Sequence, residues 1–315
     1  MTEKTAAYID PASGAFKDSV ERVRFAERRG FDSVWVTQLV AERDASLVLA
    51  AYAHATERIG LGGGVFPIAA RHPTATAQMA ATLDEWSGGR FRLGLGVSNA
   101  VIVEWMWGLK WARPLEAMRE YLAIVRAGLR QGEVDVRGAQ FSARWSYAPP
   151  RRPDLPILIG AVSPKMLELA GEVADGVVLW MCSPAYVRSW VIPHVRAGRA
   201  KAGLPLDGFE VISLIPVGIT TDLAAAYAAV RQAMHFYTRV PIYQRVLEAS
   251  GYARDVTSGT LSHHTLTQLT GFGTADTVRA TIARYRAAGC TLPAIWPFAG
   301  FHGSAPYEAT LEAAA

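Results

Sequence analysis

Residues 59–96 read IGLGGGVFPIAARHPTATAQMAATLDEWSGGRFRLGLG, and this stretch decides how the chain folds. Two aliphatic runs, 59–64 and 91–96, have the character of strands, and the segment 73–85 between them has the character of a helix. Glycine crowds the end of each predicted strand. Because glycine weakens a strand, its repetition there indicates that a flat or anionic group approaches the backbone closely. We therefore predict a cofactor site where these strand ends meet.

The same alternation of strand and helix continues along the whole chain. The predicted strands are 6–10, 33–37, 59–64, 91–96, 156–160, 176–180, 209–218 and 292–298. The predicted helices are 15–29, 46–55, 73–85, 115–131, 164–173, 184–202, 223–237 and 275–288. This α/β alternation gives about eight units, the number in a closed (β/α)8 barrel, whose active sites lie at the carboxyl ends of the strands. A doubly wound sheet shares the alternation, but no Gly-x-Gly-x-x-Gly follows the first strand.

Two segments depart from the alternation. Residues 132–153 have the pattern of a hairpin followed by a proline-rich connector, and residues 239–273 are too long for an ordinary barrel loop. We predict a single TIM-barrel domain, 1–315, with these two insertions in the loops of its C-terminal face.

The composition argues against several classes of protein. The 32 basic residues are interleaved with 28 acidic ones without a block of like charge, which argues against nucleic-acid binding. No apolar run reaches the ~20 residues of a membrane span, and the N-terminus lacks a secretory pattern, so we expect a cytoplasmic protein. Cys182 and Cys290 are too few for a disulfide framework, and no metal-site spacing accompanies them.

Two motifs resemble a known family. The Ser-Gly-Gly-Arg at 87–90, followed by a strand that ends Leu-Gly-Leu-Gly at 93–96, resembles the bacterial luciferase-like superfamily. The segment 156–177, PILIGAVSPKMLELAGEVADGV, is similar to the F420-dependent branch, with methylene-tetrahydromethanopterin reductase relatives and an actinobacterial group of F420-dependent oxidoreductases. The resemblance covers residues 15–298. It implies a luciferase-like (β/α)8 barrel with a deazaflavin, coenzyme F420, across its C-terminal rim.

A phosphate site is predicted at the start of the helix 164–173. The backbone amides of Gly160, Ala161, Val162 and Ser163 precede this helix, and Lys165 lies in its first turn. A helix N-terminus beside a cation is an anion site. We assign it to the cofactor phosphate, although the same residues also suit an ordinary strand-to-helix turn with Ser163 as N-cap.

The resemblance also implies where the ring lies. Family members carry a non-prolyl cis peptide in a bulge of the third strand, behind the ring. Here it maps onto Gly63-Gly64 or Gly64-Val65. Ser98 and Asn99, after the fourth strand, are assigned to the ribityl or phosphate chain of the cofactor.

Two residues are predicted to serve catalysis. Many relatives have an Asp-His pair after the second strand, whereas this chain has Gln38-Leu39. An amide forms hydrogen bonds but is no general acid, so Gln38 is predicted to orient the ring or the substrate. Glu104 loosely matches a glutamate that relatives use near the ring. Partial burial there would make it a proton donor near neutral pH.

Three functions are compatible with these features. The first is an F420-dependent oxidoreductase that transfers a hydride between deazaflavin C5 and a small imine, enone or similar substrate. The second is an FMN-dependent monooxygenase of the same superfamily. The third is a barrel that binds a flavin or deazaflavin without turnover. Loops 101–113, 139–150 and 239–273 are predicted to form an apolar, aromatic-lined substrate pocket. The resemblance also implies a homodimer.

Overall fold

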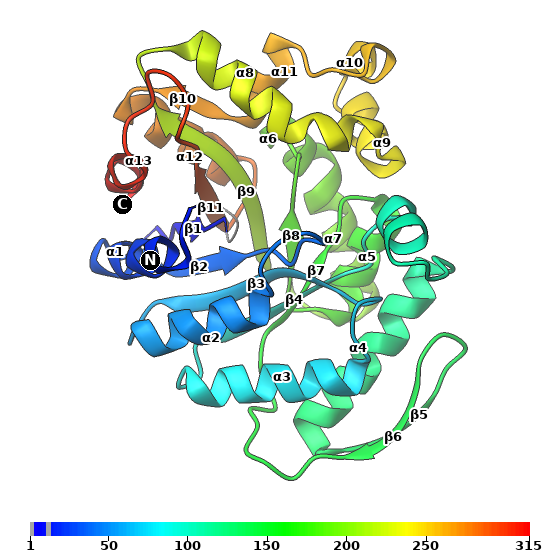
Figure 1. Cartoon of the computed structure of the whole chain (residues 1–315). Coiled ribbons are helices and arrows are strands. Elements are labelled where there is room, and N and C mark those ends of the chain that lie inside the picture. Colours follow the sequence, from blue (N-terminus) through cyan, green and yellow to red (C-terminus); the bar gives the residue numbers. More distant parts are fainter. Residues whose placement is uncertain (1–2, 11–13) are drawn as a thin grey trace.

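The computed structural model describes residues 3–10 and 14–315 as an eight-stranded barrel (Figure 1). Its strands are β1 (Ala6–Tyr8), β2 (Ser33–Val36), β3 (Gly60–Pro67), β4 (Phe91–Gly96), β7 (Ile157–Gly160), β8 (Gly176–Leu179), β9 (Glu210–Ile219) and β11 (Leu292–Pro297). Each pairs in parallel with its neighbours, and β11 closes the barrel between β9 and β1. The predicted (β/α)8 fold and all eight predicted strands are confirmed.

Eight helices surround this barrel. They are α1 (Phe16–Arg28), α2 (Ala45–Ala55), α3 (Pro73–Trp86), α4 (Pro114–Gln131), α5 (Pro164–Val173), α7 (Ile192–Lys201), α12 (Ala275–Ala287) and α13 (Tyr307–Ala314). The predicted helix 184–202 is formed by α6 (Pro184–Tyr186), the π-helical segment η2 (Val187–Val191) and α7. Seven of the eight agree with the prediction. The eighth, α13, is not among the predicted helices; it packs against α1 and α12.

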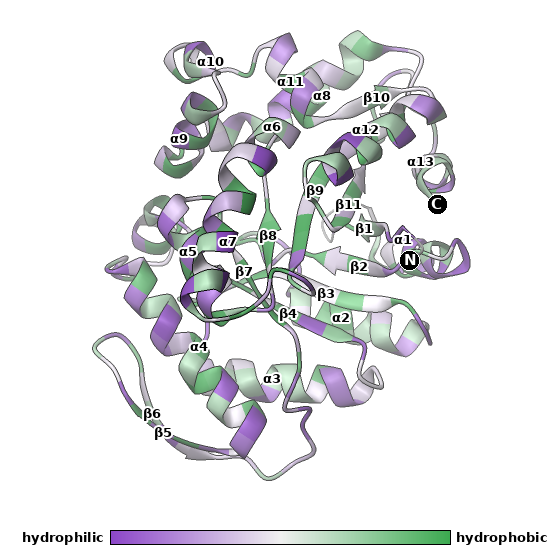
Figure 2. Cartoon of the chain, turned by 180° about the vertical axis from the view of Figure 1, so that it is seen from behind, coloured by the Kyte–Doolittle hydropathy of each residue, from purple (hydrophilic) through white to green (hydrophobic). Residues whose placement is uncertain are grey.

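Apolar side chains fill two layers. An outer layer lies between the strands and the helices, and an inner layer fills the barrel itself. The inner layer consists of Ala6, Tyr8, Trp35, Leu158, Val178, Ile212, Leu214, Leu292 and Ala294. Figure 2 shows the apolar strands at the centre and polar residues along the outer helices. The barrel is therefore a packed core, and a ligand must bind above it, at the carboxyl ends of the strands. We call that end the barrel mouth.

The first insertion is an antiparallel hairpin of β5 (Glu133–Arg137) and β6 (Ser142–Ser146), as predicted. The hairpin is inserted in the connection between α4 and β7, at the end of the barrel opposite to the mouth. From there it runs back along α4 (Figure 1). Glu120 of α4 accepts hydrogen bonds from the backbone of Ala139, Gln140 and Phe141 at the hairpin tip. The insertion thus reaches the mouth by its tip alone, and its predicted place in a loop of the C-terminal face is corrected: it belongs to the opposite end of the barrel.

The second insertion is larger than the predicted segment 239–273. It begins directly after β9 with α8 (Leu223–Met234) and continues through η3 (His235–Arg239), α9 (Pro241–Ala249), α10 (Ala253–Ser258), α11 (His263–Leu269) and the short strand β10 (Gly271–Gly273). The helix predicted at 223–237 therefore belongs to this insertion and not to the barrel wall. The reason is a separate apolar cluster, in which α8 and α11 pack with Met181 and Phe272.

The Ser87–Arg90 motif lies at the amino end of β4, far from the mouth. Its arginine donates hydrogen bonds to the carbonyl oxygens of Ala53, Thr56, Ile59 and Ser87 and to the Thr56 hydroxyl. Thr56 and Ser87 are the C-cap residues of α2 and α3. Arg90 thus ties two helix ends to the sheet, and the motif has a structural role.

Residues 3–10 and 14–315 contain no helix with the length and apolar character of a transmembrane segment. Within the same residues, His, Cys, Asp and Glu side chains form no group that could hold a metal ion. Cys182 and Cys290 are both buried and free. Burial raises the pKa of the Cys290 thiol to about 12 and that of Cys182 further still, so both are thiols at neutral pH.

Candidate active site at the barrel mouth

Strand β3 carries a bulge at residues 63–66, where its register against β4 shifts. The peptide bond between Gly64 and Val65 is cis, which confirms the second of the two predicted positions. The end of β2 holds this bulge. The Thr37 hydroxyl donates a 2.6 Å hydrogen bond to the Gly64 carbonyl, and the Gln38 backbone N–H donates to the Val65 carbonyl at 3.4 Å.

The glycines around the bulge make room for it. A Cβ at Gly94 would overlap the Gly63 carbonyl oxygen, and a Cβ at Gly96 would lie 2.5 Å from Val65 Cγ2. On the next strand, a Cβ at Gly160 would lie 3.2 Å from the same methyl group. The sequence interpretation, that a ligand approaches these glycines directly, is therefore corrected: the chain itself fills the space. The glycines make room for the Val65 side chain. A ligand at the mouth would therefore contact Val65 and not the glycines.

A chain of aromatic rings lies at the mouth. The Tyr8 and Trp296 rings lie 5.5 Å apart, Trp296 and Trp180 5.8 Å, and Trp180 and Tyr237 5.6 Å, measured between centroids. Val65, Trp180 and Trp296 pack on the inner layer of the barrel and stay partly exposed above it. Trp180 Nε1 is buried and has no hydrogen-bond partner among the described residues. An apolar floor with an unpaired donor fits a planar heterocycle that carries acceptor atoms.

Two carboxylates lie at the same mouth. Asp10 follows β1, and Glu42 lies in the loop between β2 and α2. Burial raises the pKa of Glu42 to about 7, and the charge of Asp10 adds to the increase. The pKa of the Tyr8 hydroxyl is raised well above its ordinary value, first by burial and then by the charge of Asp10. Glu42 is not among the residues predicted from the sequence, because only the assembled barrel places this loop over the mouth.

The predicted phosphate turn lies between β7 and α5. Ser163 is the N-cap residue of α5, and its side chain makes no capping hydrogen bond, whereas Asp44, Ser183 and Thr274 cap their helices. Three groups of the turn have partners: the Ala161 N–H donates to Val178 O, Val162 O accepts from the Tyr186 hydroxyl, and Ser163 O accepts from the Leu167 N–H. Lys165 is exposed in the first turn. Backbone amides of this turn and the Lys165 ammonium can therefore meet an anion together.

The remaining predicted residues lie around the mouth with other partners. The Gln38 side chain donates to Leu39 O and accepts from the Ala45 N–H, so it joins the β2 end to α2. Ser98 has a φ of 61° in the turn after β4. Asn99 accepts from the Ile102 N–H and begins the π-helical segment η1 (Val101–Met106).

Glu104 is the clearest departure from expectation. It lies on the exposed side of η1, because Val103 is the residue of that segment that turns inward. Its carboxylate accepts one long hydrogen bond, 3.4 Å, from the Trp111 N–H. Glu104 therefore lacks the partial burial on which its predicted role as a proton donor depends.

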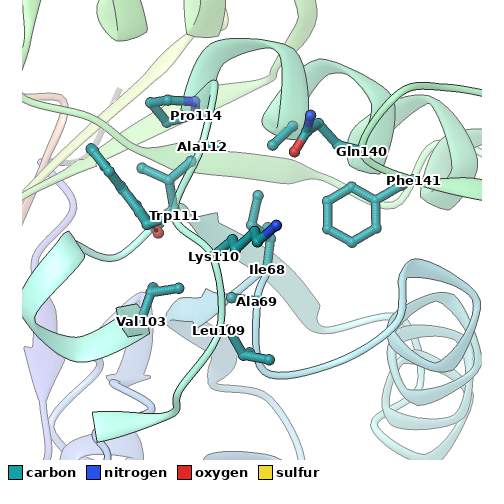
Figure 3. Close-up of a pocket in the computed structure, with 12 residues that line it drawn as sticks. Ile68, Ala69, Val103, Leu109, Lys110, Trp111, Ala112, Pro114, Gln140 and Phe141 are labelled. Carbon is teal, nitrogen blue, oxygen red and sulfur yellow. Dashed lines mark hydrogen bonds between the residues drawn. The ribbon is translucent and has the colours of Figure 1, made fainter. Parts of the chain in front are cut away.

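A cavity of about 250 Å³ opens beside the bulge, outside the barrel axis (Figure 3). Its walls are the segments after β3 and β4, the stretch 103–117 and the hairpin tip; they include Ile68, Ala69, Val97, Leu109, Lys110, Trp111, Ala112, Gln140 and Phe141. The Trp111 indole donates to Val97 O and so closes one side. Two of the three predicted substrate loops, 101–113 and 139–150, contribute to it, and it is mainly apolar as predicted.

Comparison with known proteins agrees with this geometry. Residues 2–292 match the family model of the luciferase-like monooxygenases. A Mycobacterium tuberculosis protein assigned as a coenzyme F420-dependent oxidoreductase is 34% identical over 238 residues, which cover 70% of this chain and 68% of that protein. The 5,10-methylenetetrahydromethanopterin reductase of Archaeoglobus fulgidus is 32% identical over 235 residues, covering 74% of this chain and 69% of that one.

A solved structure shares the whole fold. The coenzyme F420-dependent tetrahydromethanopterin reductase of Methanopyrus kandleri superposes with a TM-score of 0.83 at 23% identity, over 99% of this chain and 97% of that one. At this identity the likeness establishes the barrel fold alone. With the family model covering most of the chain, the assignment is firm: this chain belongs to the luciferase-like monooxygenase family.

Proposed function

We propose that this protein is a coenzyme F420-dependent oxidoreductase that transfers a hydride between the cofactor and a small electron-poor substrate. The observation that carries the proposal is the seat at the mouth, where Val65 on its bulge, with Trp180 and Trp296, forms a floor for a flat ring. The two relatives named for F420 or methanopterin chemistry support the same cofactor. When bound, a reduced deazaflavin supplies the hydride.

The chain's own residues bind and orient. Val65 would support one face of the ring, and the turn before α5, with Ser163 and Lys165, would hold the phosphate. Ser98 and Asn99 lie after β4 and are assigned to the connecting chain. Gln38 would act on the ring indirectly, because its side chain holds the end of β2 in place. The mainly apolar cavity beside the bulge suits an apolar substrate or part of one.

The first prediction concerns cofactor choice. In an absorbance titration, the purified protein is expected to bind F420 in the low micromolar range or tighter and FMN at least about tenfold more weakly, a difference of ~1.4 kcal/mol. The wild type loaded with F420H2 is then offered a panel of imines, enones and quinones. Binding of FMN and not of F420 would contradict the proposal. Binding of F420 without turnover of any substrate in the panel would instead indicate a barrel that binds the cofactor without catalysis.

The family name itself favours a second candidate, an FMN-dependent monooxygenase. Such an enzyme would consume oxygen when reduced FMN and a substrate are supplied, whereas an F420-dependent oxidoreductase would not need oxygen. An oxygen electrode separates the two. The homodimer and the cytoplasmic location that the sequence suggests stay predictions.

A second prediction tests the phosphate turn. Lys165→Met is expected to weaken F420 binding by about three- to tenfold, because it removes a cation from an anion site at a helix N-terminus. The loss should shrink at high salt, where the charge is screened. Lys17→Met, at an exposed position of α1 across the barrel, is the matched control and should bind F420 as the wild type does. Equal F420 affinities for Lys165→Met and Lys17→Met would contradict a phosphate site at this turn.

A further inference from the structure

In the loop between β2 and α2, one buried carboxyl oxygen lacks a hydrogen-bond partner among the described residues. That atom is Oε2 of Glu42. Its loop neighbours are engaged elsewhere: Arg43 donates to Gly14 O, and Asp44 caps α2 and pairs with Arg71 at 2.6 Å. Buried polar atoms almost always have a partner in native proteins, so an unpaired one calls for an explanation. A bound ligand would supply the missing partner.

The groups that face Glu42 belong to the mouth. Its charge acts on Tyr8 at the end of β1 and on Tyr237 of η3, and Asp10 acts on Glu42 itself. The Tyr8 ring contacts Trp296, and the Tyr237 ring contacts Trp180. These two indoles are part of the floor on which the ring of the proposed cofactor would lie. Glu42 therefore lies near the same space, within electrostatic range of groups at the end of β1 and on η3.

A hydrogen-bond path joins Tyr8 to the bulge. The Tyr8 hydroxyl has the Thr37 side chain as its hydrogen-bond partner, and the Thr37 hydroxyl donates to the Gly64 carbonyl at 2.6 Å. The positions of Tyr8 and the bulge are thus coupled through β2.

We propose that Glu42 is the proton donor of the reaction, an assignment that rests on the proposed function. When bound, a reduced deazaflavin would supply the hydride, with its electron pair, to one carbon of the substrate double bond and would itself be oxidised. The O–H bond of Glu42 breaks, and its proton joins the other atom of that double bond, which completes the reduction. Glu42 is left as a carboxylate and regains a proton from water.

The surroundings keep this acid protonated at the working pH. Burial and the nearby Asp10 both disfavour the charged form, so a large share of Glu42 carries its proton near pH 7. A general acid is most effective when it titrates near the working pH. Glu104, the donor predicted from sequence, is exposed on η1 and lacks such surroundings.

The test uses the full chain and compares Glu42→Gln with Glu104→Gln, and with Glu133→Gln on the exposed hairpin as matched control. The first readout is reduction of cyclohex-2-enone, or of the best substrate in the panel, by F420H2 across pH 5–9. Glu42→Gln is expected to lower kcat/KM by about 100-fold or more and to remove the fall in rate above pH 7. It should still bind F420, whereas Glu133→Gln should behave as the wild type.

The second readout needs no turnover. A glutamate in the unfolded chain titrates near about pH 4.3, and folding raises the pKa of Glu42 to about 7. Between these values the folded state binds more protons, so the contribution of Glu42 to stability falls as pH rises through this window. The Tm advantage of Glu42→Gln over the wild type should therefore be small at pH 5 and larger by about 2 °C at pH 8.

The outcomes separate the two proposals. Wild-type protein that binds F420 and reduces a substrate, while Glu42→Gln keeps the wild-type rate and pH profile, overturns the assignment of Glu42 and leaves the proposed function standing. The assignment is also overturned where Glu104→Gln alone removes the alkaline limb, or where the Tm difference at pH 8 is absent. Wild-type protein that fails to bind F420 overturns the proposed function and the assignment together.

Discussion

Gly94→Ala is expected to weaken F420 binding by about 10- to 100-fold, the effect of 1–3 kcal/mol of overpacking. The added Cβ would overlap the Gly63 carbonyl oxygen, which belongs to the backbone of the neighbouring strand. No side-chain rotation relieves such a clash, so β3 must move. The β3 bulge, and Val65 with it, would then lose the position that seats the ring. An F420 titration measures the loss, and thermal denaturation shows whether the variant stays folded.

Two related glycine variants should weaken F420 binding by smaller amounts. Gly96→Ala places its Cβ 2.5 Å from Val65 Cγ2, a side-chain atom that can shift, and Gly160→Ala places it 3.2 Å away. The loss of affinity should therefore decrease from position 94 through 96 to 160. Adding Val65→Ala to Gly96→Ala removes the methyl group that clashes, so the double variant should lose less than the two single losses together. Strictly additive losses, or wild-type affinity in Gly94→Ala, would contradict this account of the bulge.

Much of the fold was predictable because the barrel repeats one local pattern. Each buried parallel strand is a short aliphatic run, and each surface helix shows an apolar face, so eight strands and seven wall helices could be located without their contacts. The pattern fails where tertiary contacts decide. Helix α8 has the same amphipathic character as a wall helix, yet it packs in its own cluster above the barrel. Helix α13 is a further wall helix that the pattern did not locate, and it packs against α1 and α12.

The candidate site was predictable where it is local to one segment. The cis bond before Val65 followed from motif resemblance, and the turn before α5 lies within one stretch of sequence. The sequence offered no means to learn that Val65 fills the space over the glycines, because that space lies between three strands. Nor did it distinguish Glu42 from Glu104, since burial of a loop carboxylate depends on segments far away in the chain.

Arg90→Met is expected to lower the free energy of unfolding by about 3 kcal/mol, or the Tm by roughly 5 °C for a chain of this size. The guanidinium donates to the carbonyls of Ala53, Thr56 and Ile59 at 3.1, 2.9 and 2.8 Å and to the Ser87 carbonyl at 2.6 Å. Carbonyls at helix ends lack partners within the helix, and a cation there also meets the negative end of the helix dipole. Methionine keeps the length of the side chain and leaves these acceptors unpaired.

The effect should be confined to stability, because Arg90 lies at the amino end of β4 and the proposed cofactor seat at the opposite end of the barrel. Folded Arg90→Met at 20 °C should therefore bind F420 as tightly as the wild type. Arg130→Met, an exposed arginine in the last turn of α4, removes the same charge without this network and should change the Tm by less than about 1 °C. Equal melting temperatures for Arg90→Met and Arg130→Met would mean that the network adds nothing to stability. A loss of F420 affinity in folded Arg90→Met would mean that the Ser-Gly-Gly-Arg motif acts on the site after all.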